Sequence, residues 1–289
     1  MQNPPVTIQG HFPVLANERL AGATHRLTVL CPGIADQAQA GQFLTLRLPP
    51  QYAAFLRRPF GIHRVHSSCR GAVEVLYRVV GQGTKELTRV PRGDQIDLLG
   101  PLGHGFGRFP DRALHVLVAG GVGIAPFPLL AQRIRDEQPS AEIRLFFGGR
   151  TPLDLAGLDA VEPFCDHVEL TTEDGARGQW GLVTQPLAHS LDEAYAASAV
   201  IYACGPMPML REVAKFAVAH EIPCEVSLES QMACGLGTCM GCVTKTLPVK
   251  DGGLPAACDL ESGKNAKECY QRVCTEGPVF DARSIAWGG

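Results

Sequence analysis

Three cysteines stand close together in the segment ACGLGTCMGC, residues 233–242. Cys234, Cys239 and Cys242 follow the spacing C-x4-C-x2-C, and a glycine lies within two positions of each. Glycines allow a tight loop in which backbone N–H groups point at sulfur and offset the negative charge of a metal centre. Structural zinc usually takes C-x2-C pairs, whereas C-x4-C-x2-C followed by one distant cysteine is the plant-type 2Fe–2S spacing. The spacing favours an iron–sulfur cluster, with zinc as the alternative.

A fourth cysteine ligand must come from further along the chain. Cys258, Cys269 and Cys274 all follow Cys242, with 15, 26 and 31 residues in between. Distance along the sequence cannot choose among them, because the entropy cost of closing a loop grows only slowly with loop length.

Glycine-rich turns at two strand ends are candidates for binding a dinucleotide. In VLVAGGVGIAPF, Gly120, Gly121 and Gly123 lie between a buried strand and a helix, where small residues let a pyrophosphate approach the helix N-terminus. The pattern is G-x-G-x-x-P, so it differs from the fingerprint of simple dehydrogenases, and an ordinary strand-to-helix turn is the alternative. The segment YACGPMPML ends a later strand on Cys204, Gly205 and Pro206, where the alternative is a buried cysteine.

Two segments nearer the N-terminus could hold phosphate. Arg57 and Arg58 precede a strand in LRRPFGIHRV, and arginine matches phosphate in a bidentate geometry. In RVVGQGTKEL, Gly83 and Thr84 open what reads as a helix, whose first N–H groups attract anions. A solvated strand edge and a simple glycine turn are the respective alternatives.

Three regions of different composition must position these residues. Short alternating strands at 25–32, 41–49, 60–67, 71–80 and 94–102 predict an antiparallel β-barrel over residues 1–110. Strands alternating with helices predict a doubly wound, parallel α/β domain over 111–224. Residues 225–289, rich in cysteine and glycine, predict a small iron–sulfur domain. The predicted fold class is therefore α/β plus β.

Composition and charge argue against a nucleic acid partner and against a membrane span. The formal net charge of −3 gives no broad basic field, so we expect no nucleic acid partner. The longest apolar run, 113–131, is broken by glycines and prolines, so we expect no membrane span. We see no signal peptide and therefore expect a cytoplasmic protein, in which eleven cysteines favour metal or redox chemistry over disulfides.

The order of these motifs resembles the ferredoxin–NADP reductase superfamily over nearly the whole chain. R-x-F, G-x-G-T, GPLGHGF, GGVGIAPF and CGP follow one another as they do in that family. The resemblance implies an FAD in the barrel and a nicotinamide on the α/β domain. It places Arg58 on the FAD pyrophosphate, Phe60, Gly61, Leu76, Tyr77 and Arg78 along the flavin, and Gly83 and Thr84 on the phosphates. The other residues expected to bind a cofactor are Pro59, Gly120, Gly121, Gly123, Cys204, Gly205 and Pro206. Gly61 is a departure, because family members usually carry Ser or Thr there.

Within that superfamily, the chain looks most like the electron-transfer subunits of NAD-dependent dihydroorotate dehydrogenase. RVCTEGPVFDA resembles the family's closing segment, which implies Cys274 as the fourth cluster ligand and residues 245–271 as an insertion. The resemblance also implies an FMN-containing catalytic partner, in a heterotetramer with two copies of each subunit. Electrons from that partner would pass through the 2Fe–2S centre and FAD to NAD+, in pyrimidine biosynthesis. Since C–H cleavage would belong to the partner, we name no catalytic acid or base.

Two other interpretations stay open. The same layout resembles the small subunit of NADPH-dependent ferredoxin oxidoreductases and of sulfhydrogenase-type complexes. The alternative from another class is a zinc-stabilised binding module on a disabled reductase scaffold. The glycine at position 61, where the family usually has Ser or Thr, favours this alternative. Arg150 and Arg177 are available for an NADP phosphate, but the resemblance implies NAD.

Overall fold

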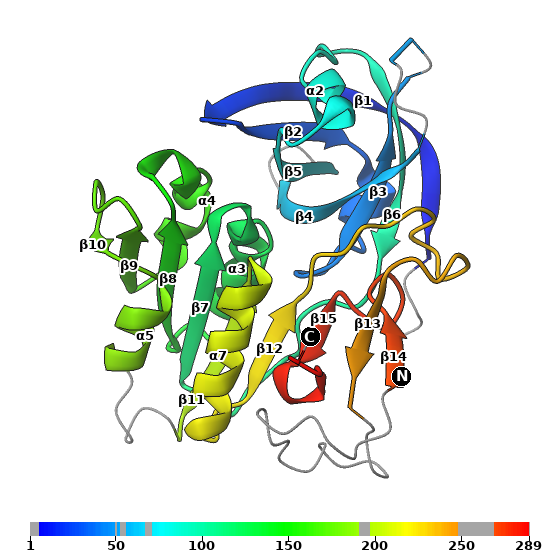
Figure 1. Ribbon diagram of the computed structural model, residues 1–289. Helices are drawn as coiled ribbons and strands as arrows, with labels where there is room; N and C mark the ends of the chain where they lie inside the picture. The colour runs from blue at the N-terminus through cyan, green and yellow to red at the C-terminus, as the bar shows by residue number, and fades with distance from the viewer. Residues whose placement is uncertain are drawn as a thin grey trace.

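The computed structural model describes residues 6–49, 51–52, 56–66, 71–190, 197–247 and 269–288. Cys69, Cys258 and most of the expected insertion lie outside these ranges. A β-barrel stands above a seven-stranded sheet, and a two-stranded ribbon lies beside the sheet (Figure 1). Within the described ranges, no helix combines the length and the apolar character needed to cross a bilayer.

The barrel forms as predicted and closes through six antiparallel strands. Its order is β1 (Ile8–Ala21), β2 (Thr24–Leu30), β5 (Ala72–Arg78), β4 (Arg58–His66), β3 (Phe43–Arg47) and β6 (Gln95–Leu102). Alternate residues fill the interior, among them Leu27, Leu46, Ile62, Val75 and Leu98, each at most 2% exposed. Two short helices, α1 (Pro32–Ala35) and α2 (Gln82–Leu87), lie in the connections between strands.

The sequence interpretation missed β1, the strand that closes the barrel. Its N-terminal half, Ile8 to Pro13, pairs with β6, and its second half, Val14 to Ala21, pairs with β2. Only Val14 is buried along its 14 residues. A strand that changes partner midway and carries a proline at the change shows little of the alternation by which strands are recognised.

The second region is the predicted doubly wound sheet. Its order is β10 (Gln179–Trp180), β9 (His167–Thr172), β8 (Glu142–Gly149), β7 (Leu114–Gly120), β11 (Ala199–Cys204), β12 (Cys224–Ser227) and β15 (Val279–Asp281), and only β15 is antiparallel. Val116 and Val118 of β7 pack in one core with α5 (Thr184–Ser190) and α7 (Met207–Ala219). Leu117 and Ala119 of the same strand pack in the opposite core with α3 (Phe127–Glu137) and α4 (Leu158–Val161).

The C-terminal region is woven into this sheet. The expected boundary at residue 225 falls inside β12, and β15 pairs with β12 at the sheet edge. Between them the chain forms the cysteine loop and the antiparallel ribbon of β13 (Val243–Thr246) and β14 (Cys269–Arg272). Trp287 Nε1 then donates a 2.8 Å hydrogen bond to Ala282 O, which fastens the C-terminal turn.

Candidate functional site

Two cavities adjoin where the barrel meets the sheet. The barrel-side cavity has a volume of about 610 Å³. The sheet-side cavity has a volume of about 620 Å³ and lies over the carboxyl ends of the parallel strands, where doubly wound sheets bind ligands. Arg78, Val122 and Glu229 line both cavities, so the two spaces share a wall.

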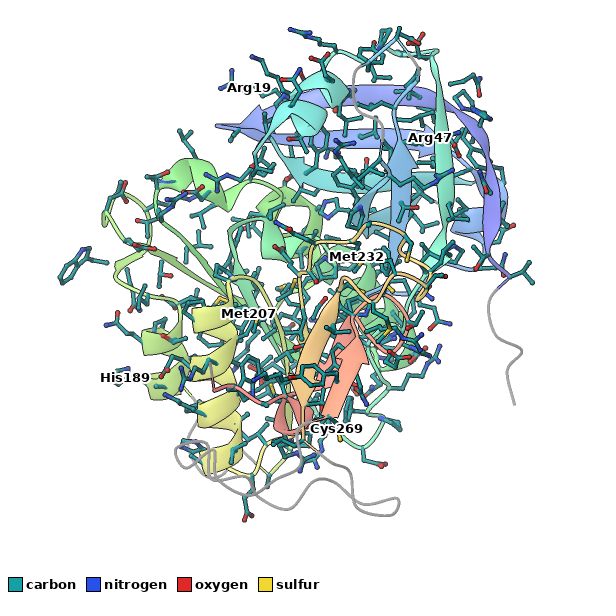
Figure 2. All side chains as sticks on the ribbon, turned by 45° about the vertical axis from the view of Figure 1, so that its right-hand side comes forward. Arg19, Arg47, His189, Met207, Met232 and Cys269 are labelled. Carbon is teal, nitrogen blue, oxygen red and sulfur yellow. The ribbon has the colours of Figure 1, made fainter. Side chains whose placement is uncertain are left out.

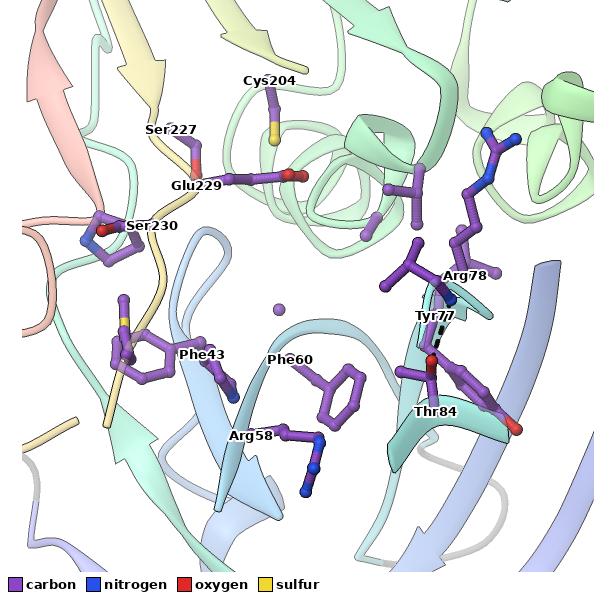
Figure 3. A pocket seen from close by; sticks show the side chains of 18 of the residues that line it. Phe43, Arg58, Phe60, Tyr77, Arg78, Thr84, Cys204, Ser227, Glu229 and Ser230 are labelled. Atoms are coloured by element: carbon purple, nitrogen blue, oxygen red, sulfur yellow. Dashed lines mark hydrogen bonds between the residues drawn. The ribbon is translucent and has the colours of Figure 1, made fainter. Parts of the chain in front are cut away.

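The barrel-side cavity gathers every barrel residue that we expected to bind a cofactor (Figure 3). These are Arg58, Pro59, Phe60, Gly61, Leu76, Tyr77, Arg78, Gly83 and Thr84. They come from β4, from β5 and from the start of α2. Cys204, which we also expected to bind a cofactor, reaches the same cavity from the end of β11.

Arg58 lies directly against the first turn of α2. A Cβ atom added to Gly83 would stand 2.1 Å from Arg58 Nε and 2.3 Å from Nη2, so only glycine leaves room for this guanidinium. Among the described residues, the guanidinium makes one hydrogen bond, 2.7 Å from Nη1 to Leu56 O. Arginine has five N–H donors, so four of them are available to an anionic ligand in the cavity.

Thr84 contributes to the cavity through its backbone. Its hydroxyl accepts hydrogen bonds from Val80 N (2.9 Å) and Gly81 N (3.2 Å) and donates to Gly81 O (3.0 Å). Because these contacts stabilise the turn, the hydroxyl is already used. The groups that Gly83 and Thr84 offer to a ligand are the N–H groups of a first helical turn, which have no intrahelical partner.

Tyr77 lines the cavity, and its ring extends into the barrel core. Its ring is 1% exposed in the barrel core, and its hydroxyl donates a 2.9 Å hydrogen bond to Asn17 Oδ1. The ring of Phe60 meets it edge-on, with 5.9 Å between the ring centroids. Leu76 and Arg78 face the opposite way along the strand, toward the sheet, as strand alternation requires.

Gly61 leaves open space beside the cavity. A Cβ atom added there would meet nothing within 4 Å. A Ser or Thr side chain therefore fits at this position, and its absence from this chain is not enforced by packing.

The sheet-side cavity contains most of the glycine residues predicted for a dinucleotide. Gly120, Gly121, Gly205 and Pro206 line it. Gly123 lines neither cavity, and it is needed for packing instead, since an added Cβ would stand 2.2 Å from Cys204 O. Further residues that were not assigned a role from the sequence also line it, at strand ends, in the turns that follow and on helices α5 and α7: Gly148, Gly149, Asp154, Thr171, Glu173, Gly181, Leu182, Val183, Thr184, Pro208, Met209, Glu212 and Glu229. The rule that ligands bind at the carboxyl edge of such a sheet is the signal that could have found them.

An ion pair joins the two regions at the shared wall. Arg78 Nη1 of β5 lies 2.7 Å from Asp154 Oδ1, in the 3₁₀ turn η2 (Pro152–Leu155) beyond β8. Asp154 Oδ2 also accepts a 3.1 Å hydrogen bond from Thr151 N. Of the two arginines considered for an NADP phosphate, Arg150 lines the sheet-side cavity and Arg177 does not.

The cysteine loop lies on the other side of the barrel-side cavity. A Cβ atom added to Gly235 would stand 2.9 Å from Thr45 Cγ2 and 3.9 Å from Phe43 Cε2, so the loop packs directly on the barrel. Phe43 and Met232 both line the barrel-side cavity. The sulfur-rich loop is therefore separated from this cavity by single side chains.

Cys242 and Cys274 are brought together at one end of the ribbon. Val273 N donates a 2.9 Å hydrogen bond to Cys242 O, and both thiols are at most 3% exposed. Burial raises the pKa of the Cys274 thiol to about 11, helped by its hydrogen bond and charge interaction with Cys242. Cys269 lies at the opposite end of the ribbon, exposed and paired with Thr246 (Figure 2).

Backbone N–H groups stabilise a thiolate at Cys234. Burial alone would raise its pKa, but hydrogen bonds from the backbone of Leu236, Cys239 and Thr238, and from the Cys239 side chain, lower it to about 6. The Leu236 N to Cys234 Sγ distance is 3.4 Å. Among the described residues, no three His, Cys, Asp or Glu side chains are arranged so that they could hold a metal ion.

Arg272 holds the loop against the ribbon. Its Nη1 donates a 3.0 Å hydrogen bond to Gly237 O, and its Nε lies 3.0 Å from Glu276 Oε2. The hydrogen bonds from Arg272 lower the pKa of Glu276 to about 2. The segment that carries Cys274 is thereby tied to the loop that carries Cys234 and Cys239.

Comparison with known proteins agrees with this architecture. Residues 117–215 match the family model for an oxidoreductase NAD-binding domain. The chain is similar to the dihydroorotate dehydrogenase B (NAD(+)) electron transfer subunit of Caldanaerobacter subterraneus subsp. tengcongensis, with 34% identity over 94% of this chain and 96% of the relative. The subunit of that name from Desulforamulus reducens is 31% identical over 95% of this chain and 97% of its own.

Among solved structures, an NADH-dependent reduced ferredoxin–NADP oxidoreductase studied for flavin-based electron bifurcation superposes with a TM-score of 0.76. It is 25% identical and covers 96% of this chain and 90% of its own. A ferredoxin–NADP+ reductase from Neisseria gonorrhoeae, 18% identical and with a TM-score of 0.60 over 73% of this chain and 91% of its own, shares the fold. The chain thus belongs to the family of dihydroorotate dehydrogenase B (NAD(+)) electron transfer subunits.

Proposed function

We propose that the chain is the electron-transfer subunit of a dihydroorotate dehydrogenase complex and passes electrons from a catalytic partner to NAD+. One observation carries this proposal: the cysteine loop, the barrel-side cavity and the sheet-side cavity lie in a row, each in contact with the next. Such a row suits a relay in which a one-electron carrier, a flavin and a nicotinamide stand side by side. The names of the full-length relatives support the same role.

The barrel-side cavity fits FAD. The space that Gly83 keeps clear for Arg58 places a cation beside a helix start, and four of its N–H donors have no partner among the described residues, an arrangement that suits a pyrophosphate. Phe60 and Leu76 supply apolar walls, and the open side at Gly61 leaves room for a ring system. A bound flavin supplies the change from single-electron to hydride chemistry, which neither an iron–sulfur cluster nor a nicotinamide supplies alone.

The sheet-side cavity fits a nicotinamide dinucleotide. Gly120, Gly121 and Gly205 leave the backbone accessible at the turns after β7 and β11, where a pyrophosphate can approach. Arg150 shares this cavity with Glu173 and other carboxylates, so its lining carries no surplus of positive charge for an additional phosphate. We propose NAD as the nucleotide.

We propose that Cys234, Cys239, Cys242 and Cys274 would bind a 2Fe–2S cluster. The backbone N–H groups around Cys234 favour its thiolate, which is the form that binds iron. Cys274 already lies beside Cys242, whereas Cys269 is separated from that end by three ribbon positions, about 10 Å at the usual strand rise. We therefore propose Cys274 as the fourth ligand.

An apolar surface surrounds the cysteine loop and suits a partner subunit. Leu236, Met240, Val243 and Tyr270 are exposed between 38% and 54%, and Cys239 is exposed among them. Large exposed apolar side chains gathered in one place usually mark an interaction site. We propose that the catalytic subunit, carrying FMN, docks here in a complex with two copies of each chain.

Reconstitution with the catalytic subunit tests this function. The chain is co-expressed with a dihydroorotate dehydrogenase catalytic subunit, and reduction of NAD+ by dihydroorotate is followed at 340 nm. We expect activity only with both subunits, and a yellow-brown chain that contains FAD, iron and sulfide. A colourless protein that contains zinc would support the binding-module alternative.

A second function is favoured by the similarity to the bifurcating ferredoxin–NADP oxidoreductase. In that case the chain would serve an NADPH-dependent ferredoxin oxidoreductase. The kcat/KM for NADH and NADPH with the isolated chain separates the two, and a clear preference for NADPH would favour this second function.

A further inference from the structure

A buried threonine of the barrel lies beneath the cysteine loop. Thr45 of β3 is 2% exposed, and its methyl carbon Cγ2 is the atom nearest to a Cβ atom added at Gly235, 2.9 Å away. Gly235 directly follows Cys234, so Thr45 packs on the part of the loop that carries this cysteine. Its neighbours Leu44 and Leu46 pack in the barrel core, and alternation along the strand therefore directs Thr45 outward, to the loop.

The hydroxyl group of Thr45 has no hydrogen-bond partner within the described part of the chain. On the two neighbouring strands, Thr45 stands opposite Pro59 and Leu99. The side chains of both are apolar, and proline also lacks a backbone N–H group, so neither side chain can pair with the hydroxyl. A buried hydroxyl group without a partner is costly, and valine would fill much the same space without that cost. The Thr45 hydroxyl therefore suits a hydrogen bond to a group that binds beside it.

The group that this hydroxyl can reach is the one held by the cysteine loop. Phe43 and Pro59 line the barrel-side cavity, whereas Thr45 does not. Sulfur accepts hydrogen bonds, and a thiolate or sulfide with negative charge accepts them more strongly than a neutral thiol. Hydrogen bonds to the sulfur atoms are among the features that set the reduction potential of an iron–sulfur cluster. The position of Thr45 thus favours an effect on the cluster over an effect on the flavin.

We propose that the Thr45 hydroxyl donates a hydrogen bond to sulfur on the Cys234 side of the 2Fe–2S site and thereby raises the reduction potential of the cluster. Reduction adds one electron and no proton to the cluster, so its sulfur atoms become more negative and bind the donor more tightly. A strand of the flavin barrel thus adjusts the second electron carrier as well. This inference rests on the proposed function, because it requires that the cysteine loop binds the 2Fe–2S cluster.

A redox titration of the chain loaded with cluster and FAD tests this role. The paramagnetic signal of the reduced cluster gives the cluster potential, and the flavin absorbance gives the FAD potential in the same titration. In Thr45→Val the equilibrium constant for cluster reduction should fall roughly three- to tenfold, since a hydrogen bond to a charged acceptor is lost. At about 59 mV per tenfold change for one electron, the midpoint potential of the cluster should fall by about 30–60 mV. The FAD potential should not change.

Two variants serve as controls. Thr45→Ser keeps the hydroxyl group and should stay within about twofold of the wild-type equilibrium constant. Thr246 is also buried, and its hydroxyl also lacks a partner among the described residues, but it pairs with Cys269 at the end of the ribbon away from Cys242. Thr246→Val should therefore leave the cluster potential unchanged.

Three results would overturn the inference. An unchanged cluster potential in Thr45→Val would show that the hydroxyl does not act on the cluster. An equal shift in Thr45→Ser or in Thr246→Val would assign the effect to packing. A shift of the FAD potential in place of the cluster potential would put the hydroxyl at the flavin. These three results leave the proposed function standing, whereas a wild-type chain without iron and sulfide would remove the proposed function and the inference together.

Discussion

Replacing Gly83 with alanine should displace Arg58 and release FAD without unfolding the barrel. The new Cβ would stand 2.1 Å from Arg58 Nε, and ordinary contact begins at 3.4 Å, so the guanidinium must retreat by at least 3.4 − 2.1 = 1.3 Å. Loss of a charge-assisted contact with the pyrophosphate costs about 1.5–3 kcal/mol, so we expect the Kd for FAD to rise roughly ten- to a hundredfold. Since alanine favours helices over glycine by about 1 kcal/mol, α2 itself should not be weakened.

Fluorescence quenching of FAD titrated with apoprotein measures this Kd, and thermal unfolding of the apoprotein checks the fold. The double variant Gly83→Ala/Arg58→Ala isolates the cause. If the glycine acts through Arg58, the double variant should bind FAD no more weakly than Arg58→Ala alone. An additive loss, or an unchanged Kd in Gly83→Ala, would refute the reasoning.

Three further predictions address the cluster, the barrel and the pH dependence of stability. Cys274→Ser should lose the visible absorbance and the paramagnetic signal of the reduced cluster, whereas Cys269→Ser should keep both; the reverse pattern would contradict the assignment. Arg57 Nη2 lies 2.6 Å from the buried carboxylate of Asp97, so Arg57→Ala should lower the free energy of unfolding in urea by about 1–3 kcal/mol, and an unchanged midpoint would argue against this. Burial lowers the pKa of His63, so below about pH 6.5 the unfolded chain binds a proton that the folded chain excludes, and stability should fall by at most ~1.4 kcal/mol per pH unit. His63→Asn, which keeps a donor for Ala125 O, should reduce this slope, and an equal slope would assign the effect to other groups.

Local patterns were sufficient for the strands rich in apolar and β-branched residues and for the order of the motifs. Strand β5 is buried at six of its seven positions, and the apolar strand β7 ends on a glycine turn, so both were predicted. Strand β1 was missed because it pairs with different neighbours along its two halves, which is a property of the closed barrel and not of its residues. Barrel closure depends on contacts between distant segments, and these leave little periodicity in the sequence.

At the candidate site, too, residue types were predicted from the sequence, whereas contacts between distant segments were not. Arg58 and Gly83 were assigned to the same cofactor through the family resemblance, but their direct contact depends on how β4 and α2 meet in space. Gly123 has the residue type of a phosphate-binding glycine and serves packing instead. Glu229 directly precedes the cysteine loop in the sequence and was given no role there, because its position where two cavities join depends on the fold.

The pairing of β12 with β15 fixes the position of the cysteine loop independently of the connection between β13 and β14. Ser227 pairs with Val279, and Leu228 N donates a 2.9 Å hydrogen bond to Pro278 O, so the chain is fastened to the sheet just before the cysteine loop and just after Cys274. The connection after β13 leaves and returns at the other end of the ribbon, where Thr246 pairs with Cys269. Shortening the chain between Leu247 and Cys269, or attaching an electrode linker or a fluorescent reporter there, should therefore leave the cysteine loop in place beside the barrel-side cavity.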